Sequence, residues 1–126
     1  MDLKNYKFSK DHEWVKLEDD MAVIGVSDYA QKEMGDVVYI ELPETGSSFS
    51  EGDTCSNIES VKAVNDIFTP LSGEVVEVNT SLEDTPENIN TDPYGSGWIF
   101  KIKISDSAEL TDLLDADQYE EYLKGI

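Results

Sequence analysis

The chain has 126 residues, of which 39% are hydrophobic, and this is enough apolar material for one globular domain over residues 1–126. It carries 28 acidic residues against nine basic ones, a net charge of −19, which argues against binding to nucleic acid or to an anionic membrane. Cys55 is the single cysteine, so an internal disulfide is excluded and the thiol is expected to be a small buried side chain.

The first half of the chain predicts short strands with one helix. The expected elements are strands at residues 14–17 and 21–26, which form an N-terminal hairpin over 14–26, then a helix at 28–35 and a strand at 37–42. Ser27 or Asp28 can cap the helix, and Gly35 can end it. The Gly- and Ser-rich segment 43–53 predicts a loop.

Residues 54–69 contain neither glycine nor proline and must be one helix or two strands joined by a tight turn. Apolar residues recur every three positions, which favours a helix, but the many β-branched residues favour a hairpin, and we predict the hairpin. The segment IESVKAVNDI is symmetric about its centre, which predicts a turn at Lys62–Ala63 with Glu59 opposite Asp66. That register lacks the Asn-Gly turn signature and sets two like charges against each other.

The second half predicts two more strands and a helical C-terminus. The expected elements are a turn at 70–73, strands at 73–78 and 98–104, a long loop at 79–97 that includes one helical turn, and a helical segment at 106–124. Asp106 and Glu109 resemble a capping box at the start of that segment. Short, frequent strands with helices mainly at the C-terminal end predict a mainly β sandwich or barrel with a helical appendage.

Few residues of this chain carry an evident chemistry. No metal-ligand cluster, phosphate loop or nucleophile elbow is visible, and the single histidine, His12, is expected to be structural or solvated. Lys62 is the only basic residue between Lys32 and Lys101. Nearby acids favour the ammonium form of a lysine, so a self-activating Schiff-base nucleophile is not expected. An attachment point that an external enzyme modifies needs only an exposed, recognisable amine.

The segments ESVKAVND and PLSGEVVEVN around Lys62 resemble the lipoyl-attachment motif of the glycine cleavage system H protein family. Further segments resemble the same family in the same order, over about Tyr6 to Tyr122: KDHEWV, IGVSDYAQ, GDVVYIELPE, DPYGSGW and AELTDLLD. The resemblance implies a lipoyl-domain-like barrel-sandwich of two small antiparallel sheets with short helices, with Lys62 at the tip of the lipoyl hairpin, residues 54–69.

The resemblance also implies roles for residues near Lys62. Lipoate would be attached covalently to Lys62, and lipoylating enzymes of the family read a glutamate and a glycine that match Glu59 and Gly73. Val61 and Ala63 complete the recognised tip. The family is thought to shelter the loaded arm in a cleft of the carrier, where a protonated amine wants a carboxylate partner, and motif position selects Glu13 and Asp66.

The implied function is that of a carrier and not of an enzyme. The lipoyl arm would take the aminomethyl group of glycine from a PLP-dependent glycine decarboxylase to a tetrahydrofolate-dependent aminomethyltransferase. A flavoprotein, dihydrolipoamide dehydrogenase (FAD), would then reoxidise it, and a lipoate ligase or octanoyltransferase would load Lys62. An alternative is an H-like lipoyl donor that relays lipoyl groups to other enzymes.

Related carrier domains fit less well. A biotin carrier would have methionine on both sides of the lysine, where this chain has Val61 and Ala63, and the lipoyl domains of 2-oxoacid dehydrogenases usually have aspartate before it. No signal or transit peptide pattern is visible, so the cytoplasm is the expected location, or the mitochondrial matrix for a processed eukaryotic form. The protein is expected to be a monomer.

Overall fold

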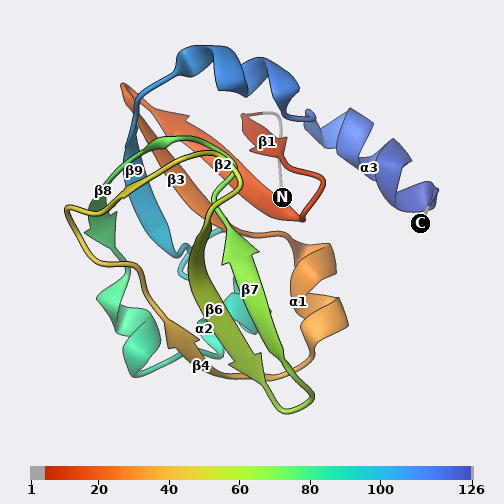
Figure 1. The fold of residues 1–126 in the computed structure, drawn as a ribbon. Helices are drawn as coiled ribbons and strands as arrows, with labels where there is room; N and C mark the ends of the chain where they lie inside the picture. The colour runs from red at the N-terminus through yellow and green to blue at the C-terminus, as the bar shows by residue number, and fades with distance from the viewer. Residues whose placement is uncertain (1–4, 126) are drawn as a thin grey trace.

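The computed structural model describes residues 5–125, and these form two antiparallel β-sheets with short helices (Figure 1). The larger sheet has six strands in the order β1-β2-β3-β9-β8-β5, and the smaller has three in the order β4-β6-β7. The strands are β1 Tyr6–Phe8, β2 Glu13–Glu18, β3 Met21–Val26, β4 Val37–Glu41, β5 Ser48–Phe49, β6 Thr54–Ser60, β7 Val64–Phe68, β8 Gly73–Val78 and β9 Phe100–Ile104. The mainly β class with two small antiparallel sheets is therefore confirmed.

The helices are short and lie mainly outside the sheets. They are α1 Asp28–Met34, α2 Asn88–Thr91 and α3 Ala116–Lys124, with 3-10 turns η1 at Thr80–Glu83 and η2 at Ser107–Asp112. Ser27 caps α1 by accepting from the Ala30 amide at 3.1 Å. Figure 1 shows α1 beside β7, at the same end of the molecule as the β6–β7 turn, and α3 at the other end near β1. None of the helices in residues 5–125 has the length and apolar character needed to cross a membrane.

The hydrophobic core explains the strand pattern. Ile58, Ile67 and Ile40 of the small sheet are buried against residues of the large sheet such as Ile24 and Val75. A second cluster forms where α3 covers the start of the large sheet, with the rings of Phe8 and Tyr119 stacked at 4.4 Å between centroids. Cys55 is buried in the main core, as predicted.

Several boundaries differ from the prediction. β1 and β5 were not predicted, because strands of three and two residues carry too little sequence signal and form only by pairing with β2 and β8. The strand expected from residue 98 begins at Phe100. Asp106 caps η2, as predicted, by accepting from the Ala108 amide at 3.0 Å, but Glu109 does not complete the predicted capping box. Glu109 instead accepts from the backbone amide and hydroxyl of Ser72, at 2.6 and 2.7 Å.

Candidate functional site: the hairpin tip at Lys62

The segment 54–69 is a hairpin, as predicted, but its register differs from the symmetric one. Glu59 pairs with Val64 and Asn57 pairs with Asp66, so the two loop residues are Val61 and Lys62. The predicted turn at Lys62–Ala63 and the pairing of Glu59 with Asp66 are both wrong. Each partner has shifted by two residues, and a shift of two keeps every side chain on the same face, so the isoleucine pattern cannot distinguish the registers.

Local hydrogen bonds hold the tip in this register. The Ser60 amide donates to the Ala63 carbonyl at 2.8 Å, and the Ser60 hydroxyl oxygen accepts from the amides of Lys62 and Ala63, each at 3.3 Å. Within the described residues, the non-glycine positions with positive φ are His12 and Asp19, so this turn needs no glycine. The Val61 amide also donates to the Asp36 carbonyl at 3.0 Å, which fastens the tip to the turn between α1 and β4.

Lys62 is exposed at the end of the small sheet and has no carboxylate within ion-pair distance among residues 5–125. Its aliphatic stem lies over Gly35, the residue that follows α1. A Cβ placed at Gly35 would come within 3.0 Å of Lys62 Cε and 3.8 Å of Nζ. The amine is therefore accessible, and its stem rests on a neighbouring turn.

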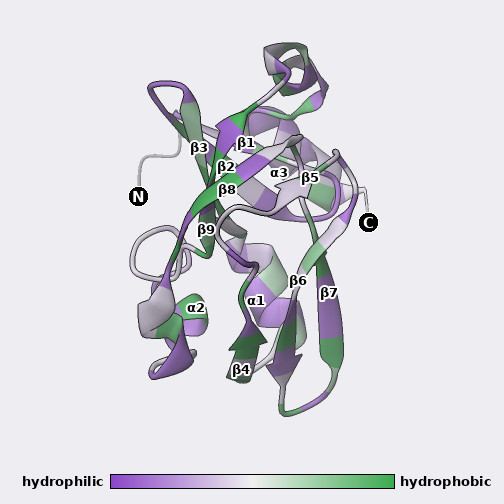
Figure 2. Ribbon diagram, turned by 60° about the vertical axis from the view of Figure 1, so that its left-hand side comes forward, coloured by the Kyte–Doolittle hydropathy of each residue, from purple (hydrophilic) through white to green (hydrophobic). Residues whose placement is uncertain are grey.

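Exposed apolar side chains surround the lysine. Val61 is 68% exposed and Val64 is 62% exposed, while Val38 and Tyr39 of β4 are 52% and 51% exposed. Tyr39, Glu59 and Val64 are consecutive partners across the three strands, so they share the outer face of the small sheet. Figure 2 shows β4 and the turn between β6 and β7, both with hydrophobic segments, at the same end of the molecule. We call Val38, Tyr39, Val61 and Val64 the tip patch.

The tip patch was only partly foreseen. Val61 belonged to the predicted recognition motif, but the β4 residues did not. In the sequence, Val38 and Tyr39 look like ordinary strand residues. Strict alternation along β4 would expose only one of these two residues. The irregular pairing between Val37 and Tyr39 exposes both, and the sequence carries no signal for it.

Glu59, Ala63 and Gly73 do not lie in one place. Glu59 and Ala63 are exposed beside Lys62 in the small sheet, whereas Gly73 is buried at the start of β8 in the large sheet. A Cβ at Gly73 would collide with the backbone carbonyl oxygen of Lys103. Gly73 thus has a packing requirement, independent of any recognition by a modifying enzyme.

Glu13 is only 2% exposed, and it is the one buried carboxyl group among the described residues. Burial raises the pKa of Glu13 to about 7, although hydrogen bonds from the Ser9 hydroxyl and the Phe68 amide partly oppose this. The Ser9 hydroxyl donates to Glu13 Oε1 at 2.6 Å. A carboxyl group with this pKa can be charged or neutral near neutral pH.

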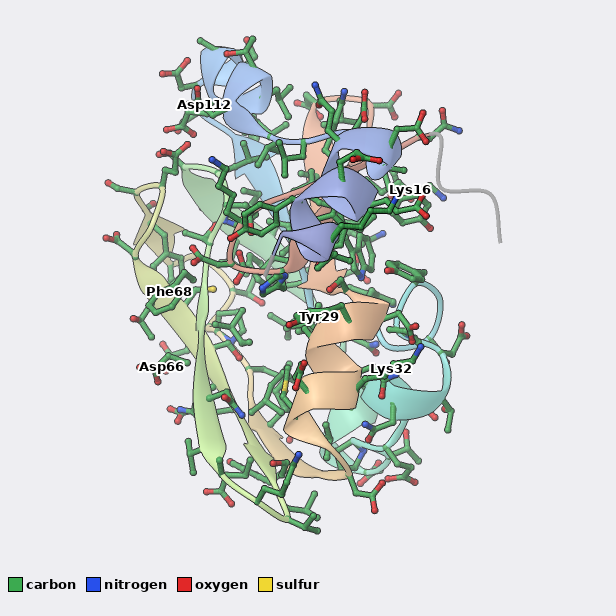
Figure 3. The ribbon with its side chains drawn as sticks, turned by 90° about the vertical axis from the view of Figure 1, so that its right-hand side faces the viewer. Lys16, Tyr29, Lys32, Asp66, Phe68 and Asp112 are labelled. Carbon is green, nitrogen blue, oxygen red and sulfur yellow. The ribbon has the colours of Figure 1, made fainter. Side chains whose placement is uncertain are left out.

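Asp66 and Phe68 lie two residues apart on β7, so both side chains are on the outer face of this strand. In Figure 3 both labelled side chains lie on the side of the hairpin away from α1 and Tyr29. Asp66 still contributes to the lining of a cavity of about 190 Å³ between α1 and β7. We call this the α1–β7 cavity. Glu13 is not among its lining residues, so the structure does not bring the two predicted carboxylates together in one wall.

His12 does line the α1–β7 cavity, together with Tyr29 and Glu33 of α1. Its Nδ1 lies 2.8 Å from the hydroxyl of Tyr119, which in turn lies 2.7 Å from the Ser27 hydroxyl. Partial burial lowers the pKa of His12, although Asp11 and Glu33 oppose this, and the neutral ring can accept the Tyr119 proton at Nδ1. His12 therefore has a structural partner, as predicted, and also faces a cavity that the sequence did not reveal. In residues 5–125, no three His, Cys, Asp or Glu side chains gather as metal ligands would.

Known proteins match nearly the whole chain. A sequence profile of the family described as "Glycine cleavage H-protein" matches residues 6–126. A glycine cleavage system H protein of Staphylococcus epidermidis is 52% identical over 118 residues, which is 94% of both chains. One from Thermotoga maritima is 51% identical over 120 residues, covering 95% of this chain and 97% of that protein.

A solved structure agrees with this assignment. The crystal structure of a glycine cleavage system H protein from Mycobacterium marinum superposes with a TM-score of 0.88 at 35% identity, over 98% of each chain. The sequence resemblance and the fold therefore lead to the same family. This chain belongs to the glycine cleavage H-protein family.

Proposed function

We propose that this protein is the lipoyl-carrying shuttle of the glycine cleavage system, with lipoate joined through an amide bond to Lys62 Nζ. The observation that carries the proposal is the position of Lys62 in a two-residue loop, exposed and outside every ion pair within residues 5–125. An acyl acceptor must enter the active site of another enzyme, and this geometry suits such entry. The residues present thus fit a covalently attached lipoyl group.

The attachment step needs little from this chain beyond presentation. A modifying enzyme supplies an activated acyl group and a base. Lys62 Nζ gives up a proton to that base and forms a bond to the acyl carbon, while the activating group leaves with its electron pair. The Ser60 hydroxyl and the Asp36 carbonyl hold the backbone of the tip during this approach, which limits the ordering that binding must impose.

When bound, the lipoyl group supplies a dithiolane that accepts the aminomethyl group of glycine. The partners are then a PLP-dependent decarboxylase, a tetrahydrofolate-dependent aminomethyltransferase and an FAD-dependent dihydrolipoamide dehydrogenase. The chain itself acts as a carrier and not as an enzyme. Its tether at Lys62 raises the effective concentration of the attached group at each partner's active site. We place this work in the cytoplasm, or in the mitochondrial matrix for a processed eukaryotic form.

Glu13 and Asp66 remain the proposed partners of an amine brought back to the carrier. Asp66 lies beside the α1–β7 cavity, and Glu13 can ionise near neutral pH when a cation approaches. Asp66 lines this cavity and Glu13 does not, so we expect them to contact different positions of the arm. Glu13→Gln and Asp66→Asn should each speed release of the amine from the loaded protein, and an unchanged release rate would remove that residue from the site.

Intact mass spectrometry tests the carrier role directly. Protein expressed in cells supplied with lipoate should carry one lipoyl group, which Lys62→Ala should lack. Lys10→Ala, another exposed lysine, should keep the group and serves as the control. An unmodified wild-type protein would refute the proposal, and trapping of a carbonyl substrate on Lys62 by borohydride would favour a Schiff-base enzyme.

A further inference from the structure

We infer that Gly35 is a positioning residue for Lys62. Because Gly35 has no side chain, the aliphatic part of Lys62 can lie directly on the α1–β4 turn, and we call this contact surface the track. The track directs Nζ and any attached arm toward α1. This rests on the proposed function, because the track matters only if Lys62 carries an arm. The proposal concerns a residue outside the attachment motif, in a different element of the fold.

The first observation is the contact itself. From an ideal Cβ position at Gly35, the three nearest atoms all belong to Lys62: Cε at 3.0 Å, Nζ at 3.8 Å and Cδ at 3.9 Å. A methyl group there would have to displace the stem, since 3.0 Å is well below normal carbon–carbon contact. The lysine stem therefore occupies the space that a side chain at Gly35 would fill.

The second observation is that the track is held in place. The Gly35 amide donates to the Gln31 carbonyl at 3.1 Å, and its carbonyl accepts from Asn90 Nδ2 at 2.9 Å. Asn90 Oδ1 accepts from the Val37 amide at 2.8 Å, so one side chain fixes both sides of the turn. The Val61 amide then ties the hairpin tip to the Asp36 carbonyl. The backbones of Lys62 and Gly35 are thus held side by side by hydrogen bonds that do not involve the lysine side chain.

The third observation is the position of Gly35 next to the α1–β7 cavity, from which we infer the direction of the arm. Gly35 directly follows Met34, which lines the α1–β7 cavity with Glu33 and Tyr29. Those three residues span roughly 7 to 8 Å along the helix axis. A stem that crosses Gly35 lies at the end of this wall. The alternative course would run over the outer face of the small sheet, where Tyr39 and Val64 are exposed.

The backbone conformation also favours glycine at position 35, and this effect can be distinguished from the contact with Lys62. Gly35 has φ of 78°, which strains any L-residue. Gly46 and Gly52 also have positive φ, at 94° and 90°, but a Cβ at either would meet nothing within 4 Å. Replacing these glycines by alanine introduces left-handed strain without touching the lysine. They are therefore matched controls.

The test uses NMR on the intact chain with ¹³C-labelled lysine, with Lys62 assigned by Lys62→Arg. In the wild type we expect an NOE between the Gly35 α-protons and the Lys62 ε-protons. Gly35→Ala should abolish the contact between the Lys62 side chain and residue 35. The Lys62 ε-carbon signal should then move toward that of a free lysine, and its order parameter should fall. Gly46→Ala and Gly52→Ala should leave this signal unchanged, even where thermal unfolding shows that they destabilise the fold.

Two results would overturn the inference. One is the absence of the NOE in the wild type, which decides the matter even if Gly35→Ala does not fold. The other is an equal loss of Lys62 order in Gly46→Ala. Either outcome leaves the mass measurement of lipoylation intact, so failure of this inference is distinct from failure of the carrier role.

Discussion

At the scale of single residues, Glu13 shows how burial changes the chemistry of a side chain. Its neighbours in the sequence, Asp11 and His12, suggest one more solvated acid in a protein full of them. In the structure its carboxyl group is enclosed, with the Ser9 hydroxyl as its hydrogen-bond donor. Few carboxyl groups are buried without a cationic partner, and desolvation of such a group is costly when it is charged.

Glu13→Gln should change the pH dependence of stability. The folded pKa of about 7 lies above the ordinary 4.5, so the folded state holds the proton more tightly than the unfolded state does. The stabilising contribution of Glu13 is therefore complete below pH 4.5 and is lost as the pH rises through about 7. The free energy of unfolding of the wild type, minus that of Glu13→Gln, should fall by about 3 kcal/mol over this interval.

Urea unfolding at a series of pH values measures this difference. Glu44→Gln, at an exposed position in the loop after β4, is the control and should show no such trend. A difference between wild type and Glu13→Gln that stays flat across the interval would contradict a buried carboxyl that holds its proton.

Gly73→Ala separates packing from recognition at another single residue. The new methyl group would meet the Lys103 carbonyl oxygen, so we expect a loss of roughly 1–3 kcal/mol in the free energy of unfolding. Gly125→Ala, where the nearest atom lies 3.6 Å away, should lose far less. If folded Gly73→Ala is lipoylated at the wild-type rate, Gly73 serves packing. A slower rate at full folding would support direct recognition.

At the scale of elements, β4 extends the exposed surface of the tip beyond the β6–β7 hairpin. The hairpin supplies Lys62 and its neighbours, but Val38 and Tyr39 come from a strand that pairs with β6. Exposed aromatic and aliphatic side chains beside Lys62 would suit contact with the proposed modifying enzyme, and aromatic residues often dominate such contacts. The α1–β4 turn approaches the same tip through Asp36 and Gly35.

Tyr39→Ser should therefore slow lipoylation without unfolding the protein. We expect kcat/KM of the modifying enzyme to fall by about tenfold, which corresponds to ~1.4 kcal/mol of lost contact. Steady-state kinetics with purified unmodified protein measure it. Val76→Ser, at an exposed valine on β8 in the other sheet, is the matched control and should leave kcat/KM unchanged. An equal effect of both substitutions would exclude a docking role for Tyr39.

At the scale of the whole molecule, a net charge of −19 on 126 residues sets a long-range field. Such a field speeds encounters with basic surfaces and repels acidic ones. The acids that produce it are spread along the chain and are mostly exposed, whereas Lys62 lies in the β6–β7 turn at one end of the fold (Figure 1). If the field accelerates association, the contacts that give specificity must come from the surface at the tip, as the substitution of Tyr39 tests.

Association with a basic partner enzyme should therefore depend strongly on salt. Raising the ionic strength from about 0.1 to 1 M shortens the Debye length from about 10 to about 3 Å. We expect the association rate constant, measured by stopped flow, to fall by roughly tenfold or more, with a smaller change in the dissociation rate. A rate constant that does not respond to salt would show that the charge serves solubility and not steering.

The sequence by itself determined the strand-rich class, the hairpin at 54–69, the lone lysine within it and, through the order of its motifs, the family. These features depend on local composition and on residue type, which a linear reading preserves. Its symmetry misplaced the turn, because a two-residue shift leaves Ile58 and Ile67 on the same face. The registers are distinguished by the hydrogen bonds of the tip, among them the bond from the Val61 amide to the Asp36 carbonyl, which lies in another element. The tertiary structure alone decided that Gly35 lies under Lys62, that Glu13 is enclosed and that His12 meets Tyr119. Each of these depends on contact between elements far apart in the chain, where packing and desolvation act and local propensity has no influence.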